Sequence, residues 1–434
     1  MRSKSQVRCG GGEKKEIRSN SYLFPYVEKP KDFKEDKKEA EKWGKKEEKK
    51  FEDKLNKQER DSVKDFVENK ENILNKYPSL TFSFNPELNT YERKTLENMN
   101  KSMDKANLSE SLITYKLVDA VNFGFNKELI NGNTISLQGK EEFIKQFNNK
   151  DILFNNYLMT HLTTQTSNNN ERVLLKIKVP SSKGQSQKTR AASINDKGEY
   201  KLLVDNGYAL HIDNITKITI KGKECLRVEG SLKETLDFKN DINGKASVWG
   251  KKNYESWEKE LSAEQRTALD GYARQDYKEI NKYLREGKSG KVELDNKIDN
   301  ISSALEKKPI PENIVVYRWC SAPEFGYNIG DSPTLKDFEN KFLNTVKEEK
   351  GFMSTSLSSE WPSAFGKRIF ILRLQVPKGY NGAYLSALGG FESEKEILLD
   401  KGSKYEINRV TEVVVKGQKR FVIDATLLNN KGDK

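Results

Sequence analysis

The sequence is poor in the residues that build disulfide frameworks and metal centres. Its 434 residues include 3 cysteines, at positions 9, 225 and 320, and 2 histidines, at positions 161 and 211. Three cysteines cannot form a disulfide framework, and their spacing matches no zinc site. So few histidines also argue against a metal centre or a histidine-based nucleophile relay. We therefore expect an activity that needs no metal.

Long hydrophobic runs are missing as well. No apolar stretch approaches the roughly 20 residues that a membrane-spanning helix needs, so we expect no stable membrane insertion. The first residues, MRSKSQVRCGGGEKKE, are basic but lack the apolar segment of a signal peptide. They are the start of a mature chain, an appended segment or the start of a cytoplasmic protein, and we expect residues 1–25 to form a flexible tail.

Charge of one sign does not dominate, although the net charge is +12. The 77 basic residues are interleaved with 65 acidic ones, as in KDFKEDKKEAEKWGKKEEKKFEDK at residues 31–54. Mixed signs at helical spacing indicate a solvated helix face with i,i+4 pairs rather than a phosphate-binding stripe. The composition therefore predicts no nucleic-acid partner.

What the sequence does contain is a second copy of itself. Trp-Gly-Lys-Lys at residues 43–46 recurs at residues 249–252. LITYKLVDAVNFGFN (112–126) aligns with IVVYRWCSAPEFGYN (314–328), and YKLLVDNGYALHIDNITKITIKG (200–222) aligns with KEILLDKGSKYEINRVTEVVVKG (395–417). An ordered series of matches at nearly constant spacing indicates one duplicated domain.

Each copy has a helical first third followed by short β-branched and aromatic runs bounded by Gly, Asn or Pro. Helices followed by runs of strands favour an α+β fold with a mixed, strand-rich core over a doubly wound sheet. We expect three parts: the tail at residues 1–25, a first domain at residues 26–235 and a second at residues 236–434.

The two copies differ at polar positions that chemistry would need. The pairs that differ are Arg318 against Lys116, Ser354 against Met159, and Glu396 against Lys201. The alignment of Ser-Thr-Ser at residues 354–356 with Met-Thr-His at residues 159–161 is the less secure one. An ammonium group in place of a carboxylate cannot act as a general base or stabilise a cation. We therefore expect the active site in the second copy.

These residue types form a coherent set for chemistry on a dinucleotide. Arg318 can grip a pyrophosphate in bidentate fashion, and Arg368 could provide a second contact. Ser354 can fix the orientation of a carboxylate. Two glutamates at i and i+2 point to the same side of an extended chain, so Glu394 and Glu396 could address one small volume. Neighbouring carboxylates can divide the stabilisation of positive charge and the acceptance of a proton.

The same residues carry a family resemblance. VYRW, FMSTSLSS and GGFESEKEILLD, in this order, resemble the arginine, Ser-Thr-Ser and Glu-x-Glu signature of arginine-specific ADP-ribosyltransferase toxins. YRWCSAPEFGY and GYARQDYKEINKYLR resemble more closely the vegetative insecticidal proteins, which are the enzymatic halves of binary toxins and group with the clostridial actin-modifying toxins. The resemblance covers about residues 30 to 430, and in this family the second of two related domains is catalytic.

The resemblance implies a role for each matching position. Residues implied to bind NAD are Arg318, Arg368, Tyr272, Tyr277, Asn281, Glu324, Ser354 and Glu396. Glu396 would bind the nicotinamide ribose and stabilise its oxocarbenium character, with Ser354 as its orienting partner. Glu394 would engage the acceptor guanidinium, and Phe391 would face the protein substrate. Clostridial members commonly carry a second arginine at the position of Trp319, so the affinity for NAD is expected to differ.

The implied function is NAD-dependent mono-ADP-ribosylation of an arginine on host actin, which blocks its polymerisation. The chain would be a secreted monomer that acts in the host-cell cytosol after translocation. Its first domain would dock to a separate pore-forming and receptor-binding component. Two alternatives remain: an NAD glycohydrolase, which transfers ADP-ribose to water, and a non-catalytic binding or delivery module.

Overall fold

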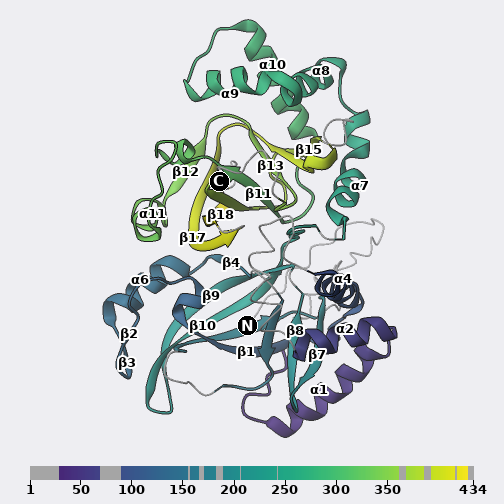
Figure 1. The fold of residues 1–434 in the computed structure, drawn as a ribbon, viewed down its shortest axis with the longest axis vertical. Coiled ribbons are helices and arrows are strands. Elements are labelled where there is room, and N and C mark those ends of the chain that lie inside the picture. The colour runs from purple at the N-terminus through teal and green to yellow at the C-terminus, as the bar shows by residue number, and fades with distance from the viewer. Residues whose placement is uncertain are drawn as a thin grey trace, which may run out of the picture.

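The computed structural model describes residues 29–68, 89–154, 157–165, 171–181, 189–205, 207–241, 243–360, 368–385, 392–415 and 418–428. Within these ranges the chain forms two halves stacked along the long axis, each with helices packed against a large twisted sheet (Figure 1). The N-terminal half contains the helices α1 (Lys37–Glu52), α2 (Lys57–Glu68), α4 (Thr90–Lys105), α5 (Ala120–Phe123) and α6 (Leu137–Phe147). Its strands are β1 (Leu112–Val118), β2 (Ile130–Asn131), β3 (Thr134–Ile135), β4 (Asp151–Leu153), β5 (Leu158–His161), β6 (Val173–Val179), β7 (Ala191–Asp196), β8 (Glu199–Val204), β9 (Tyr208–Ile220) and β10 (Lys223–Glu234).

The C-terminal half repeats this arrangement. Its helices are α7 (Lys245–Lys259), α8 (Ala263–Gly271), the π-helical turn η1 (Tyr272–Asp276), α9 (Tyr277–Arg285), α10 (Val292–Lys307), the 3₁₀ turn η2 (Ala322–Phe325), α11 (Leu335–Phe342) and the 3₁₀ turn η5 (Glu392–Glu394). Its strands are β11 (Ile314–Cys320), β12 (Val346–Glu349), β13 (Met353–Ser356), β14 (Phe370–Val376), β15 (Gly382–Tyr384), β16 (Glu396–Leu399), β17 (Ser403–Val415) and β18 (Gln418–Leu427).

The two large sheets have the same topology. The first runs in the order β4-β9-β10-β6-β1-β5-β8-β7 and the second in the order β12-β17-β18-β14-β11-β13-β16-β15. In each sheet one pair of strands is parallel, β10 with β6 and β18 with β14, and the other pairs are antiparallel. This matching order confirms the predicted α+β fold built from a duplicated domain. The first sheet ends at Glu234 and α7 begins at Lys245, on either side of the boundary predicted from the repeat.

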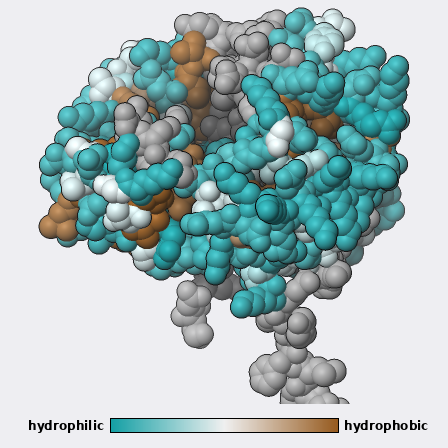
Figure 2. All heavy atoms as spheres, turned by 90° about the horizontal axis from the view of Figure 1, so that it is seen from below, coloured by the Kyte–Doolittle hydropathy of each residue, from teal (hydrophilic) through white to brown (hydrophobic). Residues whose placement is uncertain are grey.

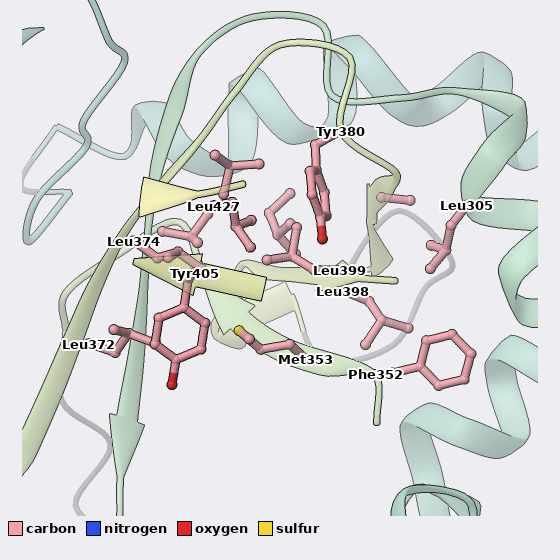
Figure 3. Packing of buried hydrophobic residues seen from close by; sticks show 14 of the residues in the cluster. Leu305, Phe352, Met353, Leu372, Leu374, Tyr380, Leu398, Leu399, Tyr405 and Leu427 are labelled. Carbon is pink, nitrogen blue, oxygen red and sulfur yellow. The ribbon is translucent and has the colours of Figure 1, made fainter. Parts of the chain in front are cut away.

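The catalytic candidates rest on the core of the C-terminal half. Figure 3 shows Phe352, just before β13, and Met353, the first residue of β13, in one cluster with Leu398 and Leu399 on β16 and Leu305 on α10. All five side chains are buried. Burial of apolar side chains on both strands fixes their pairing, because a slip of one residue would turn these side chains to the other face.

Burial on the outer faces of the sheets shows how the halves meet. Strand β6 keeps two half-exposed lysines on its outer face, Lys176 and Lys178, whereas β14 is buried along its whole length. The outer face of β14 and its neighbours packs against Leu153 and Ala209 of the N-terminal half. The burial of every residue of β14, with Arg373 and Gln375 included, therefore reflects a strand that is covered on both faces.

The face of the molecule formed by the N-terminal half is mostly polar. From the side of the N-terminal half, hydrophilic residues dominate and hydrophobic ones gather in small separate patches (Figure 2). Among the residues that the structure describes, no helix has the length and hydropathy to span a bilayer.

Candidate active site

Three neighbouring strands of the C-terminal sheet carry the central polar side chains. Arg318 lies on β11, Ser354 on β13 and Glu396 at the start of β16; Tyr317 lies opposite Ser356, and Ser356 lies opposite Glu396. Nη1 of Arg318 donates to the Ser354 carbonyl over 2.9 Å, and the Ser354 hydroxyl donates to the Glu396 carboxylate. The fold thus brings together a guanidinium, a hydroxyl and a carboxylate that are far apart in the chain.

In the N-terminal sheet, the strands β1, β5 and β8 pair in the same register as β11, β13 and β16 but carry other residues at the equivalent positions. Tyr115 lies opposite His161, and His161 lies opposite Lys201. This register confirms the less secure alignment of Ser-Thr-Ser with Met-Thr-His. Lys201, which occupies the position of Glu396, forms an ion pair with Asp196 over 2.7 Å. The first copy therefore places an ammonium where the second places a carboxylate.

Glu324 holds the guanidinium of Arg318. Oε2 of Glu324 accepts from Nε and Nη2 of Arg318 over 3.1 and 2.9 Å, and Oε1 accepts from the Ser321 backbone N–H over 2.8 Å. Burial opposes the charge of Arg318, but the Glu324 carboxylate outweighs it and raises the pKa of Arg318. Two charge-assisted hydrogen bonds to one carboxylate oxygen also fix the plane of the guanidinium. The structure therefore places Glu324 as the orienting partner of Arg318, and its implied contact with nicotinamide stays a prediction.

Arg368 lies close enough to Arg318 for the two charges to interact. Its Nη1 donates to the Trp319 carbonyl over 2.6 Å. Burial and the neighbouring charge of Arg318 lower the pKa of Arg368, while Glu324 counteracts them. Two guanidinium groups near one another are suited to the two phosphates of a dinucleotide. The Trp319 side chain points to the opposite face of the sheet, where it packs in the cluster between the halves.

Glu396 has the most strongly perturbed carboxyl group of the site. Burial raises its pKa to about 7, assisted by the charge of Glu394, while the hydroxyl of Ser354 and the charge of Arg318 work in the opposite direction. A carboxyl group in this range changes charge near neutral pH. It can therefore respond strongly to positive charge that develops beside it.

The Glu-x-Glu segment is not extended, so the prediction that Glu394 and Glu396 lie on the same side of an extended chain is wrong. Glu394 ends the 3₁₀ turn η5, Lys395 has a positive φ of 49°, and Glu396 begins β16. The alternation of side chains along a strand therefore does not place the two glutamates on the same side. Their orientation is set by the kink at Lys395. Glu394 is exposed, and partial burial raises its pKa. Its backbone carbonyl accepts from the Ser356 hydroxyl over 2.7 Å.

The Asn281 side chain connects the helical layer to the segment that precedes Ser354. Its amide oxygen accepts from the Phe352 N–H over 2.9 Å, and its amide nitrogen donates to the Phe352 carbonyl over 3.3 Å and to the Tyr272 hydroxyl over 3.0 Å. Phe352 lies two residues before Ser354, so Asn281 ties the helical layer to β13. These contacts position the strand, and they differ from the direct contact with NAD that the resemblance implies.

The two tyrosines of the helical layer differ in exposure. Tyr272 is buried, whereas Tyr277 is 41% exposed, and their rings meet edge to face with centroids 6.5 Å apart. Between them the helix widens into the π-turn η1, a feature that often marks functional sites. Tyr277 is thus the member of the pair that is free to stack on a ligand. The π-turn was not predicted from the sequence, because it has no established local sequence signal.

The predicted contact of Phe391 with the protein substrate lies outside the described residues. Within the described part of the chain, no group of three or more His, Cys, Asp or Glu side chains could hold a metal ion.

Comparison with known proteins identifies this arrangement. The family model of the ADP-ribosyltransferase exoenzymes matches the chain twice, over residues 40–234 and 246–430. The solved structure of BECa, the ADP-ribosylating toxin of a binary enterotoxin of C. perfringens, contains NADH. It has a TM-score of 0.78 and 33% identity, and the match covers 92% of this chain and 99% of that chain. The enzymatic component C2-I of the Clostridium botulinum C2 toxin has a TM-score of 0.72 and 31% identity, over 92% of this chain and 100% of that chain.

Curated relatives match about half of the chain or less. Mono-ADP-ribosyltransferase C3 from Clostridium botulinum C phage is 27% identical over 198 residues, which cover 42% of this chain and 78% of that protein. NAD(+)--arginine ADP-ribosyltransferase EFV from Enterococcus faecalis is 27% identical over 163 residues, which cover 37% of this chain and 32% of that protein. The chain belongs to the ADP-ribosyltransferase exoenzyme family, whose substrate is NAD, and over nearly its whole length it is similar to the enzymatic components of binary toxins.

Proposed function

We propose that the C-terminal half transfers ADP-ribose from NAD to an arginine of host actin and thereby blocks actin polymerisation. The observation that carries this proposal is the convergence of Arg318, Ser354 and Glu396 on three neighbouring strands. The duplicated N-terminal sheet has lysine, methionine and lysine at the equivalent positions. The relative named as an arginine ADP-ribosyltransferase supports arginine as the acceptor. Actin follows from the resemblance of the site motifs to those of actin-modifying binary toxins.

The side chains divide the reaction between them. Arg318 and Arg368 bind the phosphates, and Glu396 binds the nicotinamide ribose. The bond between the nicotinamide nitrogen and C1′ breaks, nicotinamide leaves with the bonding electrons, and Glu396 stabilises the positive charge on the ribose. An arginine nitrogen of the target then bonds to C1′, and its proton passes to Glu394, whose raised pKa suits a proton acceptor.

Two glutamine variants test these roles. Glu396→Gln should abolish both nicotinamide release and transfer, whereas Glu394→Gln should abolish transfer and retain part of the release. The measurements are nicotinamide release from NAD with and without purified actin, and labelling of actin by radiolabelled NAD. Full transfer by the Glu396 variant would end the assignment. A cell lysate with labelled NAD shows in addition whether the labelled band is actin.

NAD glycohydrolysis is the second candidate, because the same pocket could admit water as the acceptor. This activity needs Glu396 but not Glu394. Nicotinamide release that is unchanged by Glu394→Gln, together with no labelled protein in any lysate, would favour the hydrolase.

We further propose that the chain is secreted and acts in the host-cell cytosol after translocation, with residues 26–235 docking to a separate pore-forming component. The likeness to enzymatic components of binary toxins supports this division of labour. The lysine that replaces Glu396 in the first copy supports a binding role for that half. The full chain immobilised on beads should capture the pore-forming component of a related binary toxin, and soluble residues 26–235 should compete. Failure of this competitor would contradict docking through the first half.

A further inference from the structure

Lys395, between the two glutamates of the site, has a backbone conformation that side chains rarely adopt. Its φ is 49°, in the left-handed region that costs about 1 kcal/mol or more for a residue other than glycine. Such a conformation persists where surrounding contacts hold it. The kink separates an exposed Glu394 from a more enclosed Glu396.

The ammonium of Lys395 forms ion pairs with two carboxylates. Its Nζ lies 2.8 Å from Oδ2 of Asp241, whose side chain is 1% exposed, and 3.4 Å from Oε2 of Glu360. Burial disfavours the charged amine, but the carboxylates of Asp241 and Glu360 together outweigh burial and raise the pKa of Lys395. The backbone carbonyl of Lys395 accepts from the Leu357 N–H over 3.0 Å, so the turn is also tied to the segment that follows Ser-Thr-Ser.

Asp241 belongs to the segment that joins the two halves. Its Oδ1 accepts from the Ala246 N–H over 3.0 Å at the start of α7. In the same segment, the Lys239 carbonyl accepts from the Ser359 N–H over 2.6 Å, and the Lys239 ammonium donates to the Phe154 carbonyl of the N-terminal half over 3.2 Å. The connecting segment therefore contacts the N-terminal half on one side and the Glu-x-Glu turn on the other.

The first copy serves as an internal control. The position of Lys395 is occupied there by Tyr200, since His161 lies opposite Lys201 as Ser356 lies opposite Glu396. Strand β8 runs without a kink from Glu199 through Tyr200, which packs against the helix α1 at Gly44. The kink and the ammonium thus occur together in the copy that has both glutamates, Glu394 and Glu396.

We propose that Lys395 is a positioning residue, and that its ion pair with Asp241 holds the kink that separates the orientations of Glu394 and Glu396. Through this pair, the segment between the halves stabilises the turn that carries Glu394 and Glu396. The inference rests on the proposed roles of the two glutamates.

The test is a double-mutant cycle in the full chain. Lys395→Met removes the ammonium, and Asp241→Asn keeps an oxygen that can accept from Ala246 but removes the charge. Each variant should lower kcat for transfer about 10-fold or more, because small displacements of reacting groups are costly. The KM for NAD should change by a smaller factor than kcat, because the proposed phosphate contacts of Arg318 and Arg368 lie outside the pair. The double variant should be no worse than the more severe single variant.

Further variants separate positioning from loss of fold. Lys395→Arg should restore most of kcat, since arginine keeps the charge. Lys395→Gly accepts the positive φ without strain but lacks the anchor, so it should remain impaired. Lys259→Met serves as the matched control, because it removes an exposed pair with Glu255 on α7 and should leave kcat unchanged. Thermal midpoints of all variants show whether the fold is retained.

Distinct outcomes overturn distinct claims. If Lys395→Met or Lys395→Gly retains kcat within 2-fold of the parent, or if the two single effects add, the positioning role is wrong. Glu396→Gln is assayed in parallel. If it is fully active, the proposed function fails first; if it is inactive while Lys395→Met is normal, the inference about Lys395 alone fails.

Discussion

Glu396 is the residue whose charge controls the site most directly. Its carboxyl group is enclosed, receives the Ser354 hydroxyl and lies within the field of Glu394 and Arg318. Burial favours the neutral form, whereas the proposed roles of Glu396 in ribose binding and in stabilising a cation require the carboxylate. The position of this equilibrium therefore sets the fraction of molecules that are ready to react.

The rate of nicotinamide release should rise with pH through about 7 and then level off. The reason is that the pKa of Glu396 is about 7, so the required carboxylate is the minor form below this value. A pH profile of kcat/KM for NAD from pH 5.5 to 8.5 measures this. Ser354→Ala, which removes a hydrogen bond to the carboxylate, should move the profile to higher pH. A flat profile would contradict the enclosed carboxyl group.

The same shift predicts that Glu396→Gln stabilises the fold at pH 8. A carboxyl whose pKa is raised by folding binds its proton more tightly in the folded state, so stability is lost as pH rises from its ordinary value of 4.5 towards about 7. A neutral glutamine avoids this loss, and we expect a gain of about 1–3 kcal/mol at pH 8 and little change at pH 4. Urea unfolding of both proteins at the two pH values tests it, and equal stability at pH 8 would contradict it.

The secondary-structure elements of the site are held by contacts between layers. Strand β13 carries Ser354, and the helix α9 fixes this strand through Asn281, which bonds both backbone groups of Phe352. The π-turn before α9 lets Tyr272 remain buried while Tyr277 reaches the surface. The helical layer therefore sets the position of the strand and also presents an aromatic side chain beside it.

Asn281→Leu should destabilise the C-terminal half by about 1–3 kcal/mol, because it leaves the buried N–H of Phe352 without its partner. We also expect transfer to fall, since Ser354 follows two residues later. Thermal unfolding and the transfer assay measure the two effects. The matched control is Asn296→Leu on the exposed face of α10, which should change neither.

The whole molecule is held together by a buried ionic cluster between its halves. Asp424 on β18 binds both Arg373 and Arg409, and Nη2 of Arg409 donates to the Leu153 carbonyl of the N-terminal half over 2.7 Å. Gln375 donates to the Asp151 carbonyl over 3.0 Å, beside the apolar cluster. These contacts cover the outer face of the catalytic sheet.

Arg409→Met should cost about 3–5 kcal/mol, because it leaves Asp424 with one partner in place of two and removes a bond between the halves. We expect one thermal transition for the parent and two for the variant, because each half then unfolds with less coupling to the other. Differential scanning calorimetry measures this. Arg227→Met, on the half-exposed outer face of the first sheet, is the comparison and should change the transition little.

The amino-acid sequence by itself determined the duplication, the α+β class and the copy that carries the candidate site residues Arg318, Ser354 and Glu396. These properties are local: periodicity reports helices and strands, and an exchange of carboxylate for ammonium is visible in an alignment of the two copies. The tertiary structure alone decided the kink at Lys395, the contact of Asn281 with the backbone of Phe352 and the burial of β14 on both faces. Each of these depends on partners far apart in the chain, because a side chain can contact a ligand, a strand or the other half of the molecule, and only packing selects among them.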